Sequence, residues 1–208
     1  MEIYAFGSIV RGEIDKFSDV DLLILKDVEE KIQEIDKEQY SIYTYGRISE
    51  LWKEGNPFSW HLFIQSKCIF SKNDIPFLSS LGEPKPYNNI KDDLDKFTQL
   101  FYESKNSINS DSHSVDFDLS MIFLAIRNFA SCFSLGFLKK NEFSRDSALN
   151  IEEYSIQINH FVYNRLRESR LLATRGIGEK ISEIELEIII NEFEKIENWF
   201  NKLIKHTK

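Results

Sequence analysis

The sequence predicts an α+β protein, in which a small mixed sheet with helices is followed by an antiparallel four-helix bundle. Two observations carry this prediction. Short strand and helix patterns mix over residues 1–80, whereas only long helical patterns follow. Residues 81–89 (LGEPKPYNN) separate the two regions, and their two prolines and one glycine are typical of a domain boundary. We therefore expect one domain at residues 1–85 and a second at residues 86–208.

The first domain is expected to contain four strands and three helices. Strand-type residues occupy residues 2–7, 19–26, 40–45 and 67–72, and the third of these segments is rich in aromatic and β-branched residues. Helical patterns occupy residues 27–38, 48–55 and 57–66, the last of them begun by Pro57.

The second domain is expected to consist of four amphipathic helices, at residues 88–106, 114–139, 151–174 and 181–205. In the fourth, the apolar residues fall on one stripe, with Glu and Lys opposite them: Ile184, Ile188, Phe193, Ile196, Trp199, Phe200 and Leu203. Amphipathic helices joined by short loops favour an antiparallel bundle, which also offers a surface for a homodimer.

Composition narrows the class of protein. No apolar run approaches the roughly 18–20 residues that span a membrane, and no signal-peptide pattern opens the chain, so we expect a cytoplasmic protein without a membrane partner. The net charge of -8 argues against general affinity for nucleic acid. Cys68 and Cys132 stand in apolar surroundings, and we expect both to be buried free thiols.

The stretch FGSIVRGEIDKFSDVDLLIL, residues 6–25, places two carboxylates at the mouth of a buried strand. Successive side chains of a strand face opposite sides, so Asp19 and Asp21 project from the same face. Their carboxylates repel each other unless a cation lies between them. Mg²⁺ commonly takes one or two carboxylates together with substrate phosphates, so these two residues predict a magnesium site.

A Gly-Ser pair precedes these acids. Gly7 permits close backbone approach, and the Ser8 hydroxyl with nearby N–H groups can hold a phosphate. A lone Asp-x-Asp at a strand edge is usually a solvated turn. Its combination with the Gly-Ser pair, and with Arg11, Gly12 and Ser18 between them, favours a phosphate cradle facing a metal site.

The whole stretch resembles the signature of the DNA polymerase β-like nucleotidyltransferase superfamily, in particular its minimal nucleotidyltransferases. The form Gly-Ser-x-x-Arg-Gly with Ser-Asp-x-Asp-Leu is matched by Gly7, Ser8, Arg11, Gly12, Ser18, Asp19, Asp21 and Leu22. The resemblance implies that Asp19 and Asp21 hold Mg²⁺ and that Gly7, Ser8, Arg11 and Ser18 contact an NTP, with ATP the expected donor. A nucleoside monophosphate would then pass to an acceptor hydroxyl as pyrophosphate leaves.

One feature departs from the family pattern. Such enzymes commonly carry a third carboxylate on a later core strand, but residues 40–45 (YSIYTY) contain none, and Glu38 falls in the preceding turn. Three explanations of the missing acid compete: the strand is misassigned, the acid comes from another part of the chain, or catalysis is weak or absent. His61 could replace the acid as a base or be a buried histidine, and Trp60 could stack on a nucleobase or pack in the core.

Arginines concentrate at residues 165–175 of this acidic chain. We expect Arg170 and Arg175, with Arg127 behind them, to line an interdomain cleft and bind the triphosphate or an anionic acceptor. Arginine suits bidentate phosphate recognition better than lysine does. The alternative is a solvated helix face, paired with Glu168 and its neighbours.

Two functions remain open. The first is a nucleotidyltransferase whose acceptor is a partner protein, as in antitoxin-type members, an RNA end or a small molecule. The second is a catalytically weak or inactive protein of this fold that binds a partner as an antitoxin-like module. The bundle more faintly resembles the helical domains of antibiotic nucleotidyltransferases and HEPN domains. No histidine follows Arg127 at the spacing of a HEPN ribonuclease, so a ribonuclease is not supported.

Overall fold

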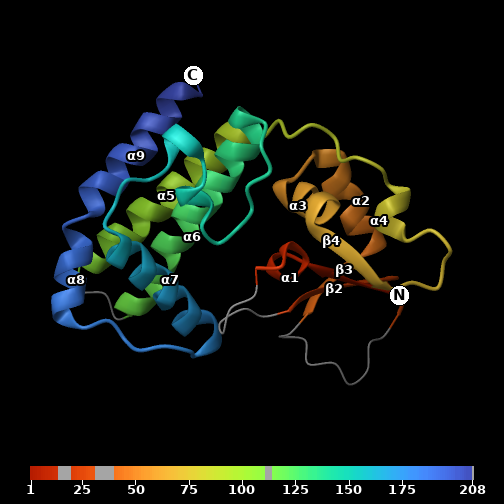
Figure 1. Ribbon diagram of the computed structural model, residues 1–208, viewed down its shortest axis with the longest axis horizontal. Coiled ribbons are helices and arrows are strands. Elements are labelled where there is room, and N and C mark those ends of the chain that lie inside the picture. The colour runs from red at the N-terminus through yellow and green to blue at the C-terminus, as the bar shows by residue number, and fades with distance from the viewer. Residues whose placement is uncertain (14–19, 31–39, 111–113, 208) are drawn as a thin grey trace. The chain divides into compact units, whose positions relative to one another are not determined.

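The computed structural model describes residues 1–13, 20–30, 40–110 and 114–207 (Figure 1). It divides into two compact units, residues Met1–Asn88 and Asn89–Lys208, and the division falls at the end of the Pro-containing segment 81–89. The first unit contains a mixed sheet with helices, and the second is helical. The predicted α+β class is therefore confirmed.

Four strands form the sheet of the first unit: β1 (Glu2–Phe6), β2 (Asp21–Lys26), β3 (Tyr40–Thr44) and β4 (Ser66–Phe70). Their order is β3-β2-β1-β4. β1 pairs antiparallel with both β2 and β4, whereas β2 and β3 run parallel, so the sheet is mixed as predicted.

Among the described residues of this unit, the helices are α1 (Ser8–Arg11), α2 (Tyr45–Glu54), α3 (Pro57–Gln65) and α4 (Phe77–Ser80). The helix predicted from residue 48 begins earlier, at Tyr45, because the Thr44 hydroxyl caps it by accepting a hydrogen bond from the Arg47 amide. Asn56 caps α3 in the same way, ahead of Pro57 at the first helical position. The predicted helix at residues 27–38 falls largely outside the described residues.

The core of this unit lies on one face of the sheet. Tyr4 and Phe6 of β1 and Leu23 and Leu25 of β2 are buried there against apolar residues of the helices, namely Ile48, Leu51, Trp52, Leu62 and Leu78. Because side chains alternate along a strand, Asp21 continues the row of Leu23 and Leu25. Its carboxylate therefore stands at the end of a buried apolar row.

The second unit contains α5 (Ile90–Asn109), α6 (Val115–Phe133), α7 (His160–Arg175), α8 (Glu183–Ile190) and α9 (Phe193–His206). Short pieces are the π-helical η2 (Ser134–Leu138), which continues α6, and the 3₁₀ turns η3 (Ser147–Leu149) and η4 (Glu152–Tyr154). α6 packs between α5 and α7, and α9 packs on α5 (Figure 1). The described residues beyond Asn89 contain no strand.

Two helix predictions for this unit were wrong in detail. The helix expected over residues 151–174 begins only at His160, because Ile151 and Ile156 are buried in an irregular segment and the Asn159 side chain caps the helix. The helix expected over residues 181–205 is two helices, since the chain breaks near Glu192, whose carboxylate accepts a hydrogen bond from the Asn159 amide.

This break alters the predicted apolar stripe. In α9 the stripe is buried, but in α8 Ile184 and Ile188 are exposed and Ile189 is buried instead. The expectation that no apolar run approaches membrane-spanning length was wrong for Val115–Leu138, which is long and apolar enough to cross a membrane, although most of it is buried inside the helical unit.

The two cysteines differ in exposure. Cys132 is a buried free thiol, as predicted, whereas the prediction for Cys68 was wrong because this residue is exposed. It lies on β4, an edge strand of the sheet, where most side chains are exposed.

Candidate active site

The Gly-Ser pair forms a sharp turn between β1 and α1. Gly7 has φ 75° and ψ -139°, and α1 begins at the next residue, Ser8. The Gly7 amide donates to the main-chain oxygen of Gln65 (3.1 Å), and the Gly7 oxygen accepts from the Val10 amide (3.1 Å). The turn is thus tied both to its own helix and to the end of α3.

Asp21 lies directly beside this turn. It is the first residue of β2 and pairs with Phe6, the last residue of β1, across the antiparallel ladder. A Cβ atom at Gly7 would stand 2.8 Å from the Asp21 Oδ2 atom, closer than real Cβ contacts come. The positive φ therefore favours glycine here, and any larger residue would also force the Asp21 carboxylate or the turn to shift. The close approach brings a carboxylate and the predicted phosphate turn together.

Arg11, at the end of α1, is held by two polar partners. Its Nε atom donates to Glu13 Oε2 (2.7 Å), and its Nη1 atom donates to Gln65 Oε1 (2.6 Å). The side chain is 17% exposed. Because arginine has five donors, these two bonds orient the guanidinium and still leave it able to bind an anion.

Gln65 is a site residue that sequence reasoning missed. Its main-chain oxygen binds the Gly7 amide and its side chain binds Arg11, so one residue fixes both ends of the turn. It stands at the C-terminal end of α3, far from Gly7 in sequence. The sequence alone could not predict this role, because Gln65 reaches Gly7 and Arg11 only once β4 is paired with β1.

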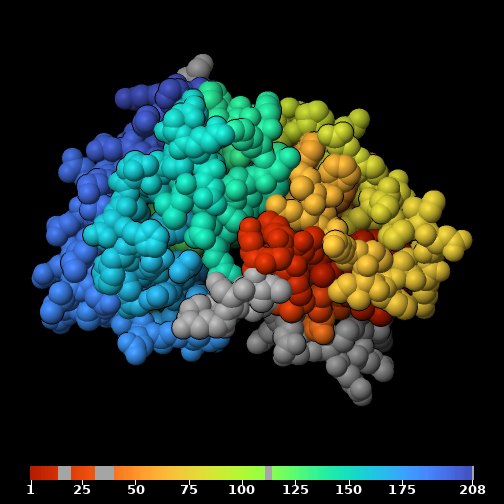
Figure 2. Space-filling view, viewed as in Figure 1, coloured from red at the N-terminus to blue at the C-terminus, as the bar shows by residue number. Residues whose placement is uncertain are grey.

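Ser8 is buried and opens α1. Figure 2 shows part of this N-terminal segment, in red, at the surface of its unit. Of the predicted site residues, Gly7, Ser8, Arg11 and Asp21 are brought together. Asp19 and Ser18 lie outside the described residues, so their place at the site stays a prediction.

The expected third acid is absent from the described part of β3. The strand covers Tyr40–Thr44, inside the predicted range 40–45, and Tyr45 instead begins α2. Glu38 lies outside the described residues, so the three explanations for the missing carboxylate stay open. In the parallel register Leu23 pairs with Ser41, which puts Ser41 and Tyr43 on the Asp21 face. Within the described ranges, no group of three or more His, Cys, Asp or Glu side chains lies close enough together to hold a metal ion.

Comparison with known proteins agrees with this geometry. Residues 1–94 match the family model described as a nucleotidyltransferase domain. Residues 1–94 are a nucleotidyltransferase domain. The match confirms the polymerase β-like class of enzyme that the opening stretch predicted. No protein of curated function matches the sequence significantly.

One solved structure that matches this chain is the spectinomycin adenyltransferase AAD(9) from Enterococcus faecialis, crystallised with ATP and spectinomycin. The likeness covers 97% of this chain and 91% of that one, at 14% sequence identity and a TM-score of 0.47.

His61 of the nucleotidyltransferase domain lies near the same end of the sheet. Its ring packs edge-on against Phe6 with a centroid distance of 5.7 Å, and Phe6 is the ladder partner of Asp21. On α3 it precedes Gln65 by one turn, so both side chains share a helix face. This position is compatible with the predicted role as a base and with that of a packed histidine.

Trp60 has a role in packing within this domain. Its ring nitrogen donates to the Lys85 oxygen (3.1 Å), and its ring packs edge-on against Phe63 with a centroid distance of 6.2 Å. These contacts anchor the segment that ends the domain. They favour the packing interpretation over stacking on a nucleobase.

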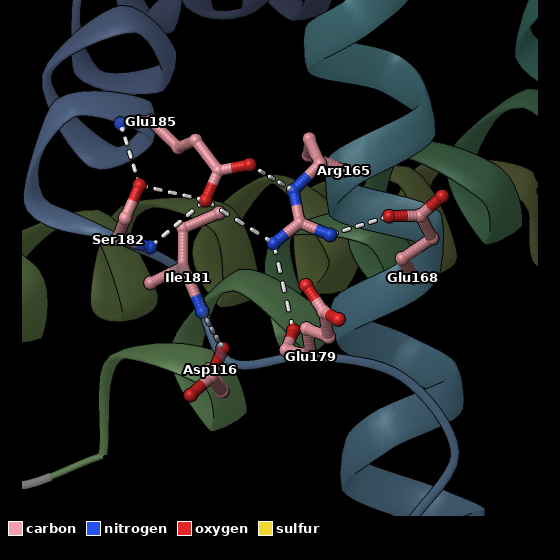
Figure 3. A network of polar contacts seen from close by, with 7 residues as sticks. All are labelled: Asp116, Arg165, Glu168, Glu179, Ile181, Ser182 and Glu185. Carbon is pink, nitrogen blue, oxygen red and sulfur yellow. Dashed lines mark hydrogen bonds and ion pairs between the residues drawn. The ribbon is translucent and has the colours of Figure 1, made fainter.

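Most arginines of the helical unit are engaged internally. Figure 3 shows the Arg165 guanidinium between Glu168 and Glu185, the latter at 2.9 Å from its Nε atom. Arg167 lies 3.7 Å from Asp146. Arg127 donates to the main-chain oxygens of residues 143 and 144, at 3.2 and 3.3 Å. Arg127 thus fastens the irregular segment to α6, and its predicted place behind an interdomain cleft stays a prediction.

The contacts in Figure 3 show that Arg165, the first arginine of the run at residues 165–175, has a structural role. Glu185 both pairs with Arg165 and completes a capping box with Ser182 at the start of α8. The Ile181 amide donates to Asp116 Oδ1 (3.0 Å), which ties the same segment to α6. Arg165 thus joins α7 to α8 and is not available to a ligand.

Arg170 and Arg175 differ from these residues. Arg170 is half-buried on α7, and its Nη1 atom donates to the hydroxyl of buried Ser120 on α6 (3.3 Å). Burial, and then the charge of Arg175, lower the pKa of Arg170. Arg175 is exposed at the end of the helix. Their predicted place in an interdomain cleft stays a prediction.

Proposed function

We propose that the protein is a Mg²⁺-dependent nucleotidyltransferase that transfers a nucleoside monophosphate from an NTP, with ATP the expected donor, to an acceptor hydroxyl. One observation carries the proposal: the Asp21 carboxylate stands against the Gly7 turn, where a side chain at Gly7 would meet it at 2.8 Å. The proposed metal ligand and the proposed phosphate-binding turn are thus neighbours in the nucleotidyltransferase domain.

The donor set suits the metal. Asp21, joined by Asp19 as the motif implies, would offer carboxylate oxygens, which Mg²⁺ prefers, and the phosphates of the nucleotide would complete its shell. When bound, Mg²⁺ neutralises charge on the phosphates and on the departing pyrophosphate.

The residues of the turn would hold the triphosphate. The first amides of a helix lack an intrahelical acceptor, so those of Ser8 and Ile9 can donate to phosphate oxygens. The Ser8 hydroxyl adds a donor. Arg11, oriented by Glu13 and Gln65, adds a positive charge at the other end of α1. Ser18 would join them, as the family pattern implies.

The acceptor is proposed by class. A hydroxyl of a partner protein, as in an antitoxin that modifies its toxin, a small molecule and an RNA end are the candidates. The net charge of -8 favours the first two, because an RNA acceptor needs a basic surface. We place this reaction in the cytoplasm, and a homodimer through the helical unit is part of the same proposal.

A second function is favoured by one observation. The described residues of β3, Tyr40–Thr44, carry no carboxylate, so the acid that commonly completes such sites is not among them. A protein of this fold that binds nucleotide or a partner without turnover would tolerate that loss. His61, whose ring contacts Phe6, is our candidate for the base if turnover occurs.

Label transfer separates the two functions. The protein is incubated with each of the four α-³²P-labelled NTPs and Mg²⁺, alone and with small-molecule, RNA and co-expressed protein acceptors, and pyrophosphate is measured in parallel. The transferase should move label to one class of acceptor. Asp21→Asn should abolish the transfer, whereas Asp27→Asn, an exposed carboxylate just beyond the other end of β2, should not. Nucleotide binding without label transfer or pyrophosphate release would favour the binding module.

A further inference from the structure

Arg170 is a half-buried cation whose surroundings supply little compensation. Its guanidinium bonds to the Ser120 hydroxyl, and Ser120 is fully buried. In the part of the chain that the structure describes, no carboxylate lies within ion-pair distance of Arg170. A second guanidinium, that of Arg175, is near enough to disfavour its charged form. A cation removed from water usually has an anionic partner, because desolvation is costly.

Other arginines of the same helix have carboxylate partners within the protein. On the same helix, Arg165 has Glu168 and Glu185 as partners, and Arg167 has Asp146. The protein has 34 acidic and 26 basic residues, so acids outnumber Lys and Arg. An arginine to which the described residues supply no carboxylate is suited to bind an anion from outside the protein.

We propose that Arg170 and Arg175, with the Ser120 hydroxyl, form an oxyanion-binding site on the helical unit that takes a phosphate-type group. The Ser120 hydroxyl accepts from Nη1 and fixes the orientation of the guanidinium, whose other donors can bind two oxygens of a phosphate. Arg175, exposed at the end of α7, supplies a second charge. The site does not depend on the proposed nucleotidyl transfer.

The test uses the full chain with inorganic pyrophosphate in EDTA, which keeps divalent metal from contributing. Pyrophosphate affinity is measured by calorimetry and by the ligand-dependent rise in melting temperature. Arg170→Lys keeps the charge but loses the bidentate geometry, and we expect about tenfold weaker binding, the loss that follows from one charge-assisted hydrogen bond. Arg175→Gln, at an exposed position, should weaken binding severalfold.

Arg167→Lys is the matched control, because this arginine is on the same helix and its partner is Asp146. It should bind pyrophosphate like the parent. Asp21→Asn should also keep pyrophosphate binding in EDTA, so failure of the proposed transferase and failure of this site give different results. Melting temperatures without ligand show that each variant is folded.

The source of the anion follows from competition. If the site takes the nucleotide's phosphates, ATP but not adenosine displaces pyrophosphate. If it takes an anionic group of the acceptor, pyrophosphate still binds when MgATP is saturating. Either result supports the site. Equal pyrophosphate affinity for the parent, Arg170→Lys and Arg167→Lys, or no pyrophosphate binding by the parent, would overturn it.

Discussion

Substituting Gly7 by alanine tests the contact between the turn and the metal-binding strand. The added Cβ would meet Asp21 Oδ2 at 2.8 Å, so either the carboxylate or the turn must move. The backbone adds a second penalty. At φ 75° and ψ -139°, a non-glycine residue costs about 1–3 kcal/mol.

Gly12→Ala is a matched control at the other end of α1. Gly12 has φ 76° and ψ 14°, and no atom lies within 4 Å of a Cβ placed there. Gly12→Ala should therefore lower the free energy of unfolding only through its strained backbone conformation, by about 1–2 kcal/mol. Both variants should therefore lose stability in urea. Only Gly7→Ala should also lose affinity for MgATP, by about tenfold or more, because Mg²⁺ tolerates little distortion of its ligands.

A double-mutant cycle isolates the contact itself. In an Asp21→Ala background the carboxylate is gone, so Gly7→Ala should cost less free energy of unfolding than in the parent, by about 0.5–3 kcal/mol. Urea unfolding gives the four stabilities, and calorimetry gives MgATP affinity. Equal costs of Gly7→Ala in both backgrounds, with MgATP affinity unchanged, would refute the close approach of Gly7 and Asp21.

Three further predictions follow from single contacts. Glu2 is buried; burial raises the pKa of its carboxyl group, but the hydrogen bonds that its carboxylate accepts leave this pKa lowered. Its contribution to stability should therefore be complete above about pH 4.3, the pKa in the unfolded chain, and be lost as the pH falls through the lower pKa of the folded state. Glu2→Gln should lower the free energy of unfolding by about 1–3 kcal/mol at pH 7, measured by urea unfolding. Gln65→Ala should raise the KM for nucleotide severalfold while kcat changes little, because Arg11 loses the partner that orients it. Gln65→Glu, which keeps an acceptor for Arg11, should restore KM. An unfolded Gln65→Ala variant, or one in which only kcat changes, would contradict this role. A thiol reagent should modify Cys68 in the native protein and Cys132 only after unfolding, although burial and then the charge of Glu2 raise the pKa of Cys68; equal labelling rates would contradict the assigned exposures.

The sequence could predict those parts of the site that lie in one continuous stretch. Gly7 and Asp21 are separated by a turn and a short helix, and the alternation of β2 fixes the face of Asp21. The role of Gln65 could not be predicted, because its bonds to Gly7 and Arg11 exist only once α3 and β4 are placed against β1.

Tertiary contacts also explain the wrong predictions. The apolar residues near position 151 suggested a helix, yet Ile151 and Ile156 are buried in an irregular segment that Arg127 and Ser147 fasten to α6. Cys68 stands in an apolar run, and its exposure follows from the edge position of β4, which no local pattern reveals.

The arginines divide in the same way. Local spacing correctly marked the 165–175 run as unusual, but it could not separate Arg165, which joins α7 to α8, from Arg170, which contacts Ser120. That distinction depends on which acids the fold brings near each guanidinium.

Magnesium-dependent ATP binding is the most direct measurement of the proposed site. Calorimetry is performed on the parent, Asp21→Asn and Asp27→Asn, each with Mg²⁺ and with EDTA. We predict that the parent binds ATP much more tightly with Mg²⁺, that Asp27→Asn behaves like the parent, and that Asp21→Asn loses the magnesium-dependent gain. Equal magnesium-dependent affinity in Asp21→Asn and the parent would contradict a metal–nucleotide site at the start of β2.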